Sequence, residues 1–170
     1  MPKRFLLIFL ITFLIFIITA LSFVDKAYFL CPIDYKTRII IRNDKFGNGD
    51  FAVRRSGGRR HAGIDLLAPV GREIKAVRLG KVNEARFHKN LGNYVELHHN
   101  GGSVTIYGHL SRLLVKEGQW VPQGSVIGLV GKSGNANNSK MEAHLHFELR
   151  KDNNSINPLG LLEKRGHPHD

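Results

Sequence analysis

Two histidines separated by a single leucine stand in the otherwise apolar stretch EAHLHFELR, residues 142–150. Apolar and polar residues alternate there with a period of two, which predicts a β-strand whose two faces differ. His144 and His146 therefore share one face, about 6.6 Å apart at a rise of about 3.3 Å per residue. At that separation one imidazole can bind a metal ion while the other reaches a group bound to the ion. A lone pair of this kind is more commonly the polar face of a strand, so a metal site requires further residues elsewhere in the chain.

A second group of ligand-type residues lies in HAGID, residues 61–65. Positions four apart in an extended segment share a face, so His61 and Asp65 can converge, and Gly63 leaves room between them. An imidazole and a carboxylate are both good zinc ligands, although this spacing is common by chance. His109 is a third candidate because it ends the alternating run SVTIYGHLS.

The elements that would position these residues are short strands. From about residue 39 the chain contains alternating or β-branched runs: RIIIR, GIDLLAPV, EIKAVRLGKVNEARF, NYVELHH, SVTIYGHL, WVPQGSVIGLVG and AHLHFELR. Turn signals rich in glycine and asparagine separate them, and no long amphipathic helix is predicted. This punctuation predicts an all-β fold, either a sandwich or a barrel.

The N-terminal segment has a different composition. Residues 5–24 carry no charge, and about 20 apolar residues in a helix match the roughly 30 Å core of a bilayer. Lys3 and Arg4 precede the segment, which favours an N-terminus on the inside. We expect residues 1–25 to be an uncleaved anchor in the inner or cytoplasmic membrane, with the globular part facing the periplasm or cell wall. A cleaved signal is the alternative, because Ala20-Leu21-Ser22 suits a signal peptidase, and the protein would then be secreted.

The rest of the 170-residue chain is predicted to be one basic domain without a disulfide. Residues 26–170 carry 23 Lys or Arg and 13 Asp or Glu, which favours anionic partners such as lipid headgroups or carboxylate-bearing cell-wall polymers. A location outside the cytoplasm makes nucleic acid the least favoured partner. Cys31 is the only cysteine, and the bulky residues before it disfavour lipid modification. We expect a linker and first strand over 26–44, the folded domain over 45–162 and a polar tail over 163–170.

Three further features have weaker signals. GSVIGLVGKSG contains Gly-Lys-Ser near its end, but a phosphate-binding loop needs glycine where this chain has Val126. His98 and His99 adjoin an Asn-Gly-Gly turn and are predicted to be turn or surface residues. Glu148 shares the face of the two strand histidines, where it can orient a histidine or pair with an arginine.

Four segments resemble, in this order, the lysostaphin-type (LytM-like) zinc metallopeptidases, which cut peptide bonds in bacterial peptidoglycan. The segments are HAGIDLLAPVG, GNYVELHHNGGSVTIYGHLS, EGQWVPQGSVIGLVGKSG and HLHFEL, and the likeness covers roughly residues 45–160. The resemblance implies an antiparallel β-sandwich of the duplicated hybrid motif type. It also implies one Zn²⁺ per chain, bound by His61, Asp65 and His146, and a catalytic pair formed by His109 and His144.

The function implied is that of a zinc endopeptidase acting on peptidoglycan stem peptides or cross-bridges. Three protein ligands leave the fourth zinc position open for water, and without a His-Glu-x-x-His motif the two remaining histidines are the natural acid and base. A tyrosine that the lysostaphin branch often places shortly before its first ligand is missing, which leaves oxyanion stabilisation to His109, His144 or Arg55. The alternative is a non-catalytic relative that binds cell wall or activates a partner amidase. Such members lose metal ligands, whereas every ligand is present here.

Overall fold

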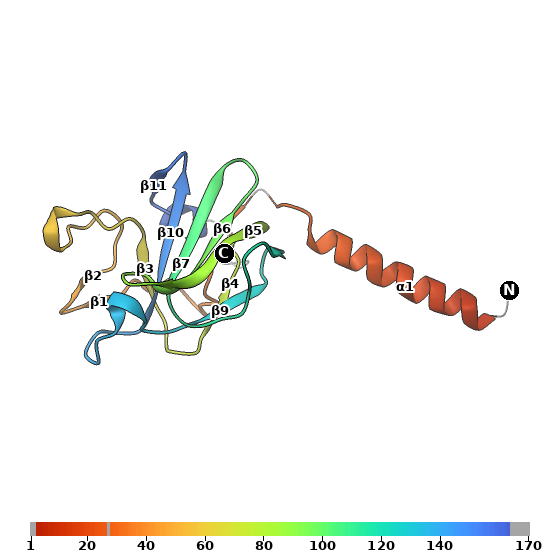
Figure 1. Ribbon diagram of the computed structural model, residues 1–170, viewed down its shortest axis with the longest axis horizontal. Coiled ribbons are helices and arrows are strands. Elements are labelled where there is room, and N and C mark those ends of the chain that lie inside the picture. The colour runs from red at the N-terminus through yellow and green to blue at the C-terminus, as the bar shows by residue number, and fades with distance from the viewer. Residues whose placement is uncertain (1–2, 27, 164–170) are drawn as a thin grey trace.

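The computed structural model describes residues 3–26 and 28–163, which form one long helix and a β domain. The helix α1 (Lys3–Ser22) projects away from the domain (Figure 1). The strands in chain order are β1 (Asn43–Asp44), β2 (Gly47–Asn48), β3 (Ile64–Leu67), β4 (Glu73–Lys75), β5 (Gly80–His88), β6 (Gly92–His98), β7 (Ser103–Leu113), β8 (Trp120–Val121), β9 (Val126–Val130), β10 (His144–Lys151) and β11 (Asn154–Ile156). Short helical turns are η1 (Ser56–Gly58), η2 (Gly134–Ala136) and α2 (Leu159–Glu163).

The predicted all-β class is confirmed, and every strand pairing is antiparallel. The run RIIIR, predicted as a strand, forms only an isolated bridge between Ile41 and Leu66. The residues on either side of this bridge still bond to β3: Leu67 N–H donates to the Ile40 carbonyl and Arg42 N–H to the Asp65 carbonyl, each at 2.8 Å. The β1–β2 hairpin begins directly after this run, at Asn43. The structure adds β1, β2, β11 and α2, which the sequence patterns did not predict.

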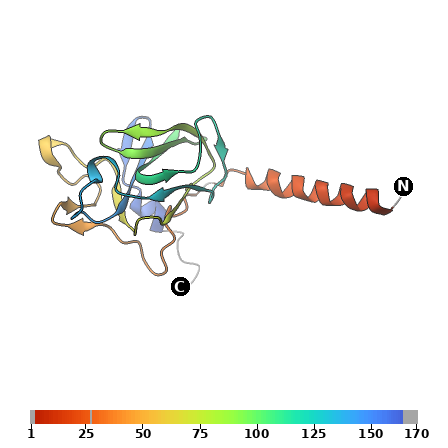
Figure 2. The same ribbon diagram turned by 60° about the horizontal axis from the view of Figure 1, so that its bottom comes forward.

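The strand β7 joins the two halves of the sandwich. Residues 103–108 of β7 pair with β10, whereas residues 110–113 pair with β9. Between these parts lies His109, with a positive φ of 66°, and the ladder of β7 with β6 shifts its register there, between Tyr107 and Leu110. Positive φ is uncommon for a residue with a side chain. The kink falls where β7 changes its partner from β10 to β9, and it places the imidazole of His109 at that point. The strands of the β domain lie together at one end of the molecule, away from the projecting helix (Figure 2).

The apolar face of β10 contributes to the core as the alternation predicts. Leu145 and Phe147 are buried, and the Phe147 ring lies 5.3 Å from the ring of Tyr107 on β7. The histidine face of β10 is also buried, with His144 and His146 only 2% and 8% exposed. β10 is therefore a central strand with both faces covered.

The prediction for His99 was wrong, although His98 is exposed as expected. His99 is buried, its Nδ1 lies 2.8 Å from the Leu79 carbonyl oxygen and its Nε2 lies 2.7 Å from Thr105 Oγ1. A turn signal does not reveal burial of this kind, because Leu79 lies 20 residues away in the chain. Burial lowers the pKa of His99 and favours the neutral imidazole.

The helix α1 leaves the domain at the end opposite the β1–β2 hairpin (Figures 1 and 2). Residues 4–21 have a mean hydropathy of 2.7 and are long and apolar enough to cross a membrane, a test that a signal sequence near the N-terminus also passes. Asp25 lies just beyond the helix, and its carboxylate accepts two hydrogen bonds from Arg78, at 2.7 and 2.8 Å. Most of the predicted polar tail, residues 164–170, lies outside the described residues.

Candidate metal centre

Three ligand-type atoms meet on the polar face of β3 and β10. His61 Nε2, Asp65 Oδ1 and His146 Nδ1 form a triangle with sides of 3.0, 2.9 and 3.0 Å. All three residues are buried, and they form the only group of three or more metal-ligand residues found among the residues that the structure describes. These are the three residues that the sequence predicted as ligands.

Strand register brings these atoms together. In the ladders of β10, His146 lies opposite Asp65 on β3 and opposite Gly108 on β7. Paired residues in an antiparallel sheet share a face, so Asp65 and His146 are adjacent across the strands. His61 lies in the segment just before β3. Gly63 in this segment packs so closely on β10 that a Cβ there would lie 2.2 Å from the Phe147 carbonyl oxygen.

Hydrogen bonds fix the orientation of the two histidines of this triangle. His61 Nδ1 lies 2.8 Å from the Asp50 carbonyl oxygen, which only accepts, so the ring donates there and its Nε2 is directed at Asp65 and His146. His146 Nε2 lies 2.9 Å from Glu148 Oε1, and Arg150 holds the other oxygen of Glu148. Glu148 therefore both orients a histidine and pairs with an arginine, the two roles that the sequence left open. A second partner on the far nitrogen is typical of metal-binding histidines.

Two arginines hold the carboxylate of Asp65 from the side away from the histidines. Asp65 Oδ2 accepts hydrogen bonds from Arg42 Nη2 at 3.1 Å and Arg55 Nη2 at 2.9 Å. Burial raises the pKa of Asp65, but hydrogen bonds from His146 and His61 outweigh it and move the pKa far below its usual range. The carboxylate is therefore ionised and has Oδ1 directed at the two imidazoles.

The electrostatics of His146 favour a positive charge in this position. Burial alone would lower its pKa, but hydrogen bonds to Asp65 and Glu148 raise it to about 9. Two buried carboxylates therefore flank one imidazole, a setting that stabilises either a proton or a metal cation there.

His109 and His144 lie beside this triangle. Their ring centroids are 5.0 Å apart, and the ring of His109 is 5.7 Å from that of His146. His144 Nδ1 lies 2.7 Å from the Glu142 carbonyl oxygen and His109 Nδ1 lies 3.0 Å from that of Ser133, so each ring keeps a lone pair on Nε2. Burial lowers the pKa of both, to about 3 for His109, and keeps both imidazoles neutral. The structure thus brings all five predicted residues into one cluster.

Sequence reasoning missed one side chain and several backbone groups of this cluster. Arg42 was predicted only as the end of the strand run RIIIR, yet it is 2% exposed and contacts both Asp65 and Asp44. An arginine after an apolar run carries no signal of burial, because its partner lies 23 residues away in the chain. Arg55, considered for oxyanion stabilisation, contacts the carboxylate of Asp65.

The donor set fits a zinc ion. Two ligand atoms at the usual zinc bond length of about 2.0–2.1 Å and the tetrahedral angle lie about 3.3 Å apart, close to the 2.9–3.0 Å sides found here. Two imidazoles and one ionised carboxylate are also the ligand types that zinc takes in catalytic sites.

Three donors beside two neutral histidines on an antiparallel β-sandwich are the arrangement expected of a metallohydrolase. Residues 59–158 match the model of peptidase family M23. The chain belongs to this family, and the resemblance to lysostaphin-type enzymes is confirmed.

Individual relatives support the same assignment. The chain is 38% identical over 100 residues to the peptidoglycan DD-endopeptidase ShyC of Vibrio cholerae, a match that covers 59% of this chain and 22% of the relative. Among solved structures, a zinc-containing peptidase from Vibrio cholerae matches with a TM-score of 0.65 at 32% identity, covering 78% of this chain and 39% of that one. The SpoIIQ–SpoIIIAH pore-forming complex matches with a TM-score of 0.64 at 27% identity, covering 79% and 90%. The chain spans about a fifth to a third of the length of the first curated relatives it matches.

Proposed function

We propose that this protein is a zinc-dependent endopeptidase that hydrolyses peptide bonds in peptidoglycan stem peptides or cross-bridges. One observation carries the proposal: four buried histidines each have one ring nitrogen hydrogen-bonded to an acceptor. The opposite nitrogens of His61 and His146 lie at Asp65, and those of His109 and His144 are free to accept. Membership of a peptidase family supports the reaction class.

His61, Asp65 and His146 would hold one zinc ion. When bound, zinc supplies a Lewis acid that acidifies water and polarises a carbonyl group. His109 and His144 then serve as the acid–base pair, because a neutral imidazole with a free Nε2 accepts a proton from the attacking water. The imidazole that has gained this proton hydrogen-bonds through Nε2–H to the oxyanion and then transfers the proton to the leaving amine.

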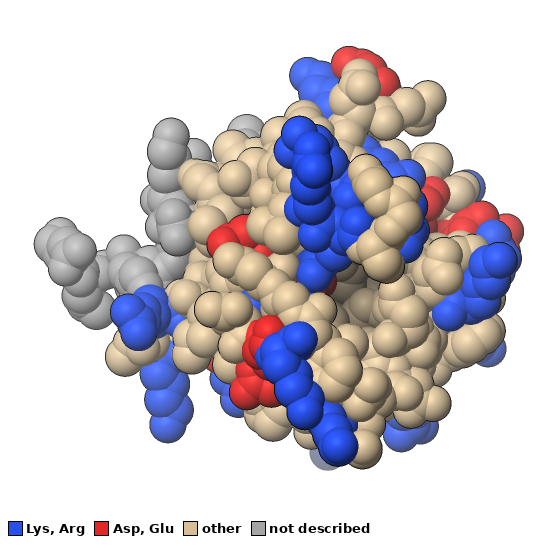
Figure 3. All heavy atoms as spheres, turned by 90° about the vertical axis from the view of Figure 1, so that its left-hand side faces the viewer, with Lys and Arg blue, Asp and Glu red and all other residues tan. Residues whose placement is uncertain are grey.

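The surface charge around the site agrees with a substrate that carries carboxylates. Lys and Arg side chains gather around a hollow on the end of the molecule that carries the β1–β2 hairpin (Figure 3). Arg54, Arg59 and Arg60 are exposed in the loop before His61. Stem peptides bear carboxylates, whereas a glycine bridge bears none, so we propose cleavage of cross-links between stem peptides. The α1 helix would anchor the protein in the membrane or serve as its signal segment.

The test uses the full-length chain in a mild detergent, with the variant His146→Ala and the matched control His98→Ala, which removes an exposed histidine. Zinc is measured per chain, and purified peptidoglycan is digested before the released termini are identified by mass spectrometry. We expect one zinc per chain and new termini at stem-peptide cross-links for the wild type and His98→Ala, and neither for His146→Ala. A wild type without stoichiometric zinc, or without new termini, would refute the proposal, and cleavage of glycyl bonds alone would refute the choice of substrate.

A second candidate is a non-catalytic binding role, which the likeness to the SpoIIQ–SpoIIIAH complex favours. The complete donor set argues against it, because a binding role needs no metal ligands. Equal cell-wall binding by the wild type and His146→Ala, with no cleavage by either, would support this alternative.

A further inference from the structure

A pocket of about 500 Å³ lies one step beyond the candidate site along the β3–β10 ladder. His146 pairs with Asp65, and the next residue pair on the same face is His144 and Leu67. Leu67 lines the pocket, and so does Glu142, whose carbonyl oxygen holds the ring of His144. The pocket is therefore adjacent to His144 through Leu67 and Glu142, within reach of a peptide that is bound at the candidate site.

The outer wall of the pocket comes from residues 33–40, which precede the region that matches the peptidase family. Hydrogen bonds attach this segment to the domain: Tyr35 donates its hydroxyl to the Leu67 carbonyl at 2.9 Å, and Leu67 N–H donates to the Ile40 carbonyl at 2.8 Å. Lys75 N–H also donates to the Pro32 carbonyl at 2.9 Å. The wall is thus preformed, and it is a feature of this chain outside the matched family region.

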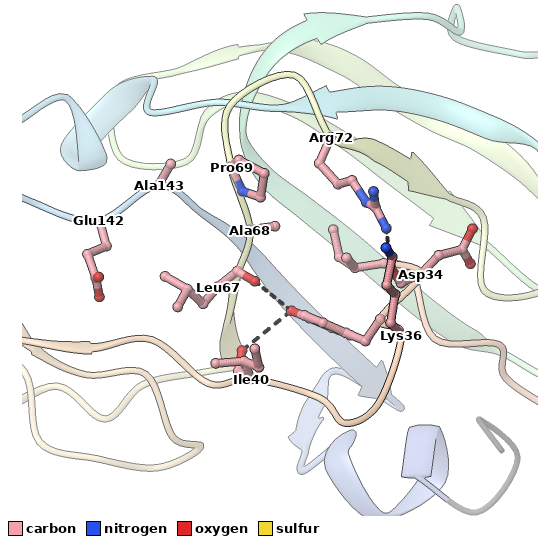
Figure 4. A pocket seen from close by; sticks show the side chains of 11 residues that line it. Asp34, Lys36, Ile40, Leu67, Ala68, Pro69, Arg72, Glu142 and Ala143 are labelled. Carbon is pink, nitrogen blue, oxygen red and sulfur yellow. Dashed lines mark hydrogen bonds between the residues drawn. The ribbon is translucent and has the colours of Figure 1, made fainter.

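Charges differ between the two ends of the pocket. Ile40, Leu67 and Pro69 form an apolar middle, with Lys36 and Arg72 at one end and Glu142 at the other (Figure 4). This separation gives the pocket a direction, because a ligand carboxylate is attracted to the cationic end and repelled from the end near His144.

The two cations are available to a ligand. Arg72 donates to the backbone carbonyl of Asp34, which leaves its charge uncompensated, and the Asp34 carboxylate pairs with Lys75 at 2.5 Å. Within residues 3–26 and 28–163, Lys36, Arg72 and Glu142 have no side-chain ion pair.

We propose that this pocket binds the free carboxyl-terminal residue of a peptidoglycan stem peptide. The terminal carboxylate lies at Lys36 and Arg72, and a small aliphatic side chain packs on Ile40, Leu67 and Pro69. Glu142 excludes the opposite orientation. The inference rests on the proposed function for the identity of the ligand, and it makes the protein selective for stem peptides whose carboxyl terminus is free.

The experiment measures binding and cleavage separately on the full-length chain in detergent. Fluorescence anisotropy gives the Kd of a labelled stem pentapeptide with a free carboxyl terminus and of its carboxamide. The variants are Lys36→Gln and Arg72→Gln, and the matched control is Lys151→Gln, which alters an exposed lysine at the far end of β10. KM for a cross-linked muropeptide with free or amidated termini is measured in parallel.

We expect the wild type to bind the free acid about tenfold more tightly than the amide. Each pocket variant should weaken binding of the acid about three- to fivefold, the upper range for an exposed charge pair, and leave the amide unchanged, as should Lys151→Gln for both ligands. Equal binding of acid and amide by the wild type, or equal effects of Lys36→Gln and Lys151→Gln, would overturn the subsite even if cleavage occurs. Tighter binding of the free acid than of the amide, without any cleavage, would support the subsite and refute the endopeptidase activity.

Discussion

Gly63 offers a sharp test of how the site is assembled. Its backbone lies outside the positive-φ region, so alanine is disfavoured there only by lack of space. The added Cβ would lie 2.2 Å from the Phe147 carbonyl oxygen and 2.8 Å from its carbonyl carbon, whereas ordinary contacts are 3.4–4 Å. The segment before β3 must therefore move about 1 Å away from β10, and it carries His61 and Asp65 away from His146.

The expected cost of Gly63→Ala follows from this displacement. Overpacking typically costs about 1–3 kcal/mol of unfolding free energy, and the upper end applies because the obstructing atoms are backbone. A misplacement of about 1 Å at reacting groups costs about 10²-fold in rate. The zinc affinity should fall with it, because the three donors separate.

The matched control is Gly160→Ala. Nothing lies within 4 Å of a Cβ at Gly160, in the short helix α2, where alanine is favoured. Urea unfolding of the full-length chain in detergent can be followed through Trp120, the only tryptophan, and zinc affinity by competition with a chromophoric chelator. Gly63→Ala with wild-type zinc affinity and an unfolding free energy within about 0.5 kcal/mol of Gly160→Ala would show that the packing argument is wrong.

Three further predictions concern the site, the domain edge and the helix. His144→Ala should retain zinc and lose about 10²–10⁴-fold in turnover, whereas His146→Ala should lose zinc and activity together. The zinc content of both variants is measured, and loss of zinc from His144→Ala with retention in His146→Ala would show that the two roles are exchanged. Asp25→Asn should be less stable than the wild type at neutral pH, because hydrogen bonds from Arg78 lower the pKa of Asp25. A carboxyl group with a lowered folded-state pKa contributes stability above its unfolded pKa of about 3.9, so the difference should shrink as the pH falls below about 4, and a pH-independent difference in urea unfolding would contradict this account. If α1 is a retained anchor, the full-length chain should sediment with membranes and resist alkaline extraction, and recovery of a soluble form that begins near Phe23 would establish a cleaved signal instead.

Local patterns in the sequence were sufficient for the strands and for the candidate residues. The period of two in β10 predicts that Leu145 and Phe147 face the core and that His144 and His146 share the other face, since side-chain direction along a strand depends only on neighbouring residues. The types and spacing of His61, Asp65 and His109 gave the remaining members of the cluster through the family resemblance. The uncharged run at residues 5–24 likewise predicts a helix of sufficient length, because hydropathy is a local property.

Only the tertiary structure decided how these residues meet. The pairing of His146 with Asp65, the kink at His109 and the burial of Arg42 all depend on contacts between distant parts of the chain. Strand register and the partners of a buried charge are set by which strands pair, and a sequence period carries no information about that choice. For the same reason a turn signal misplaced His99 at the surface, and the pocket walled by residues 33–40 had no sequence signal at all.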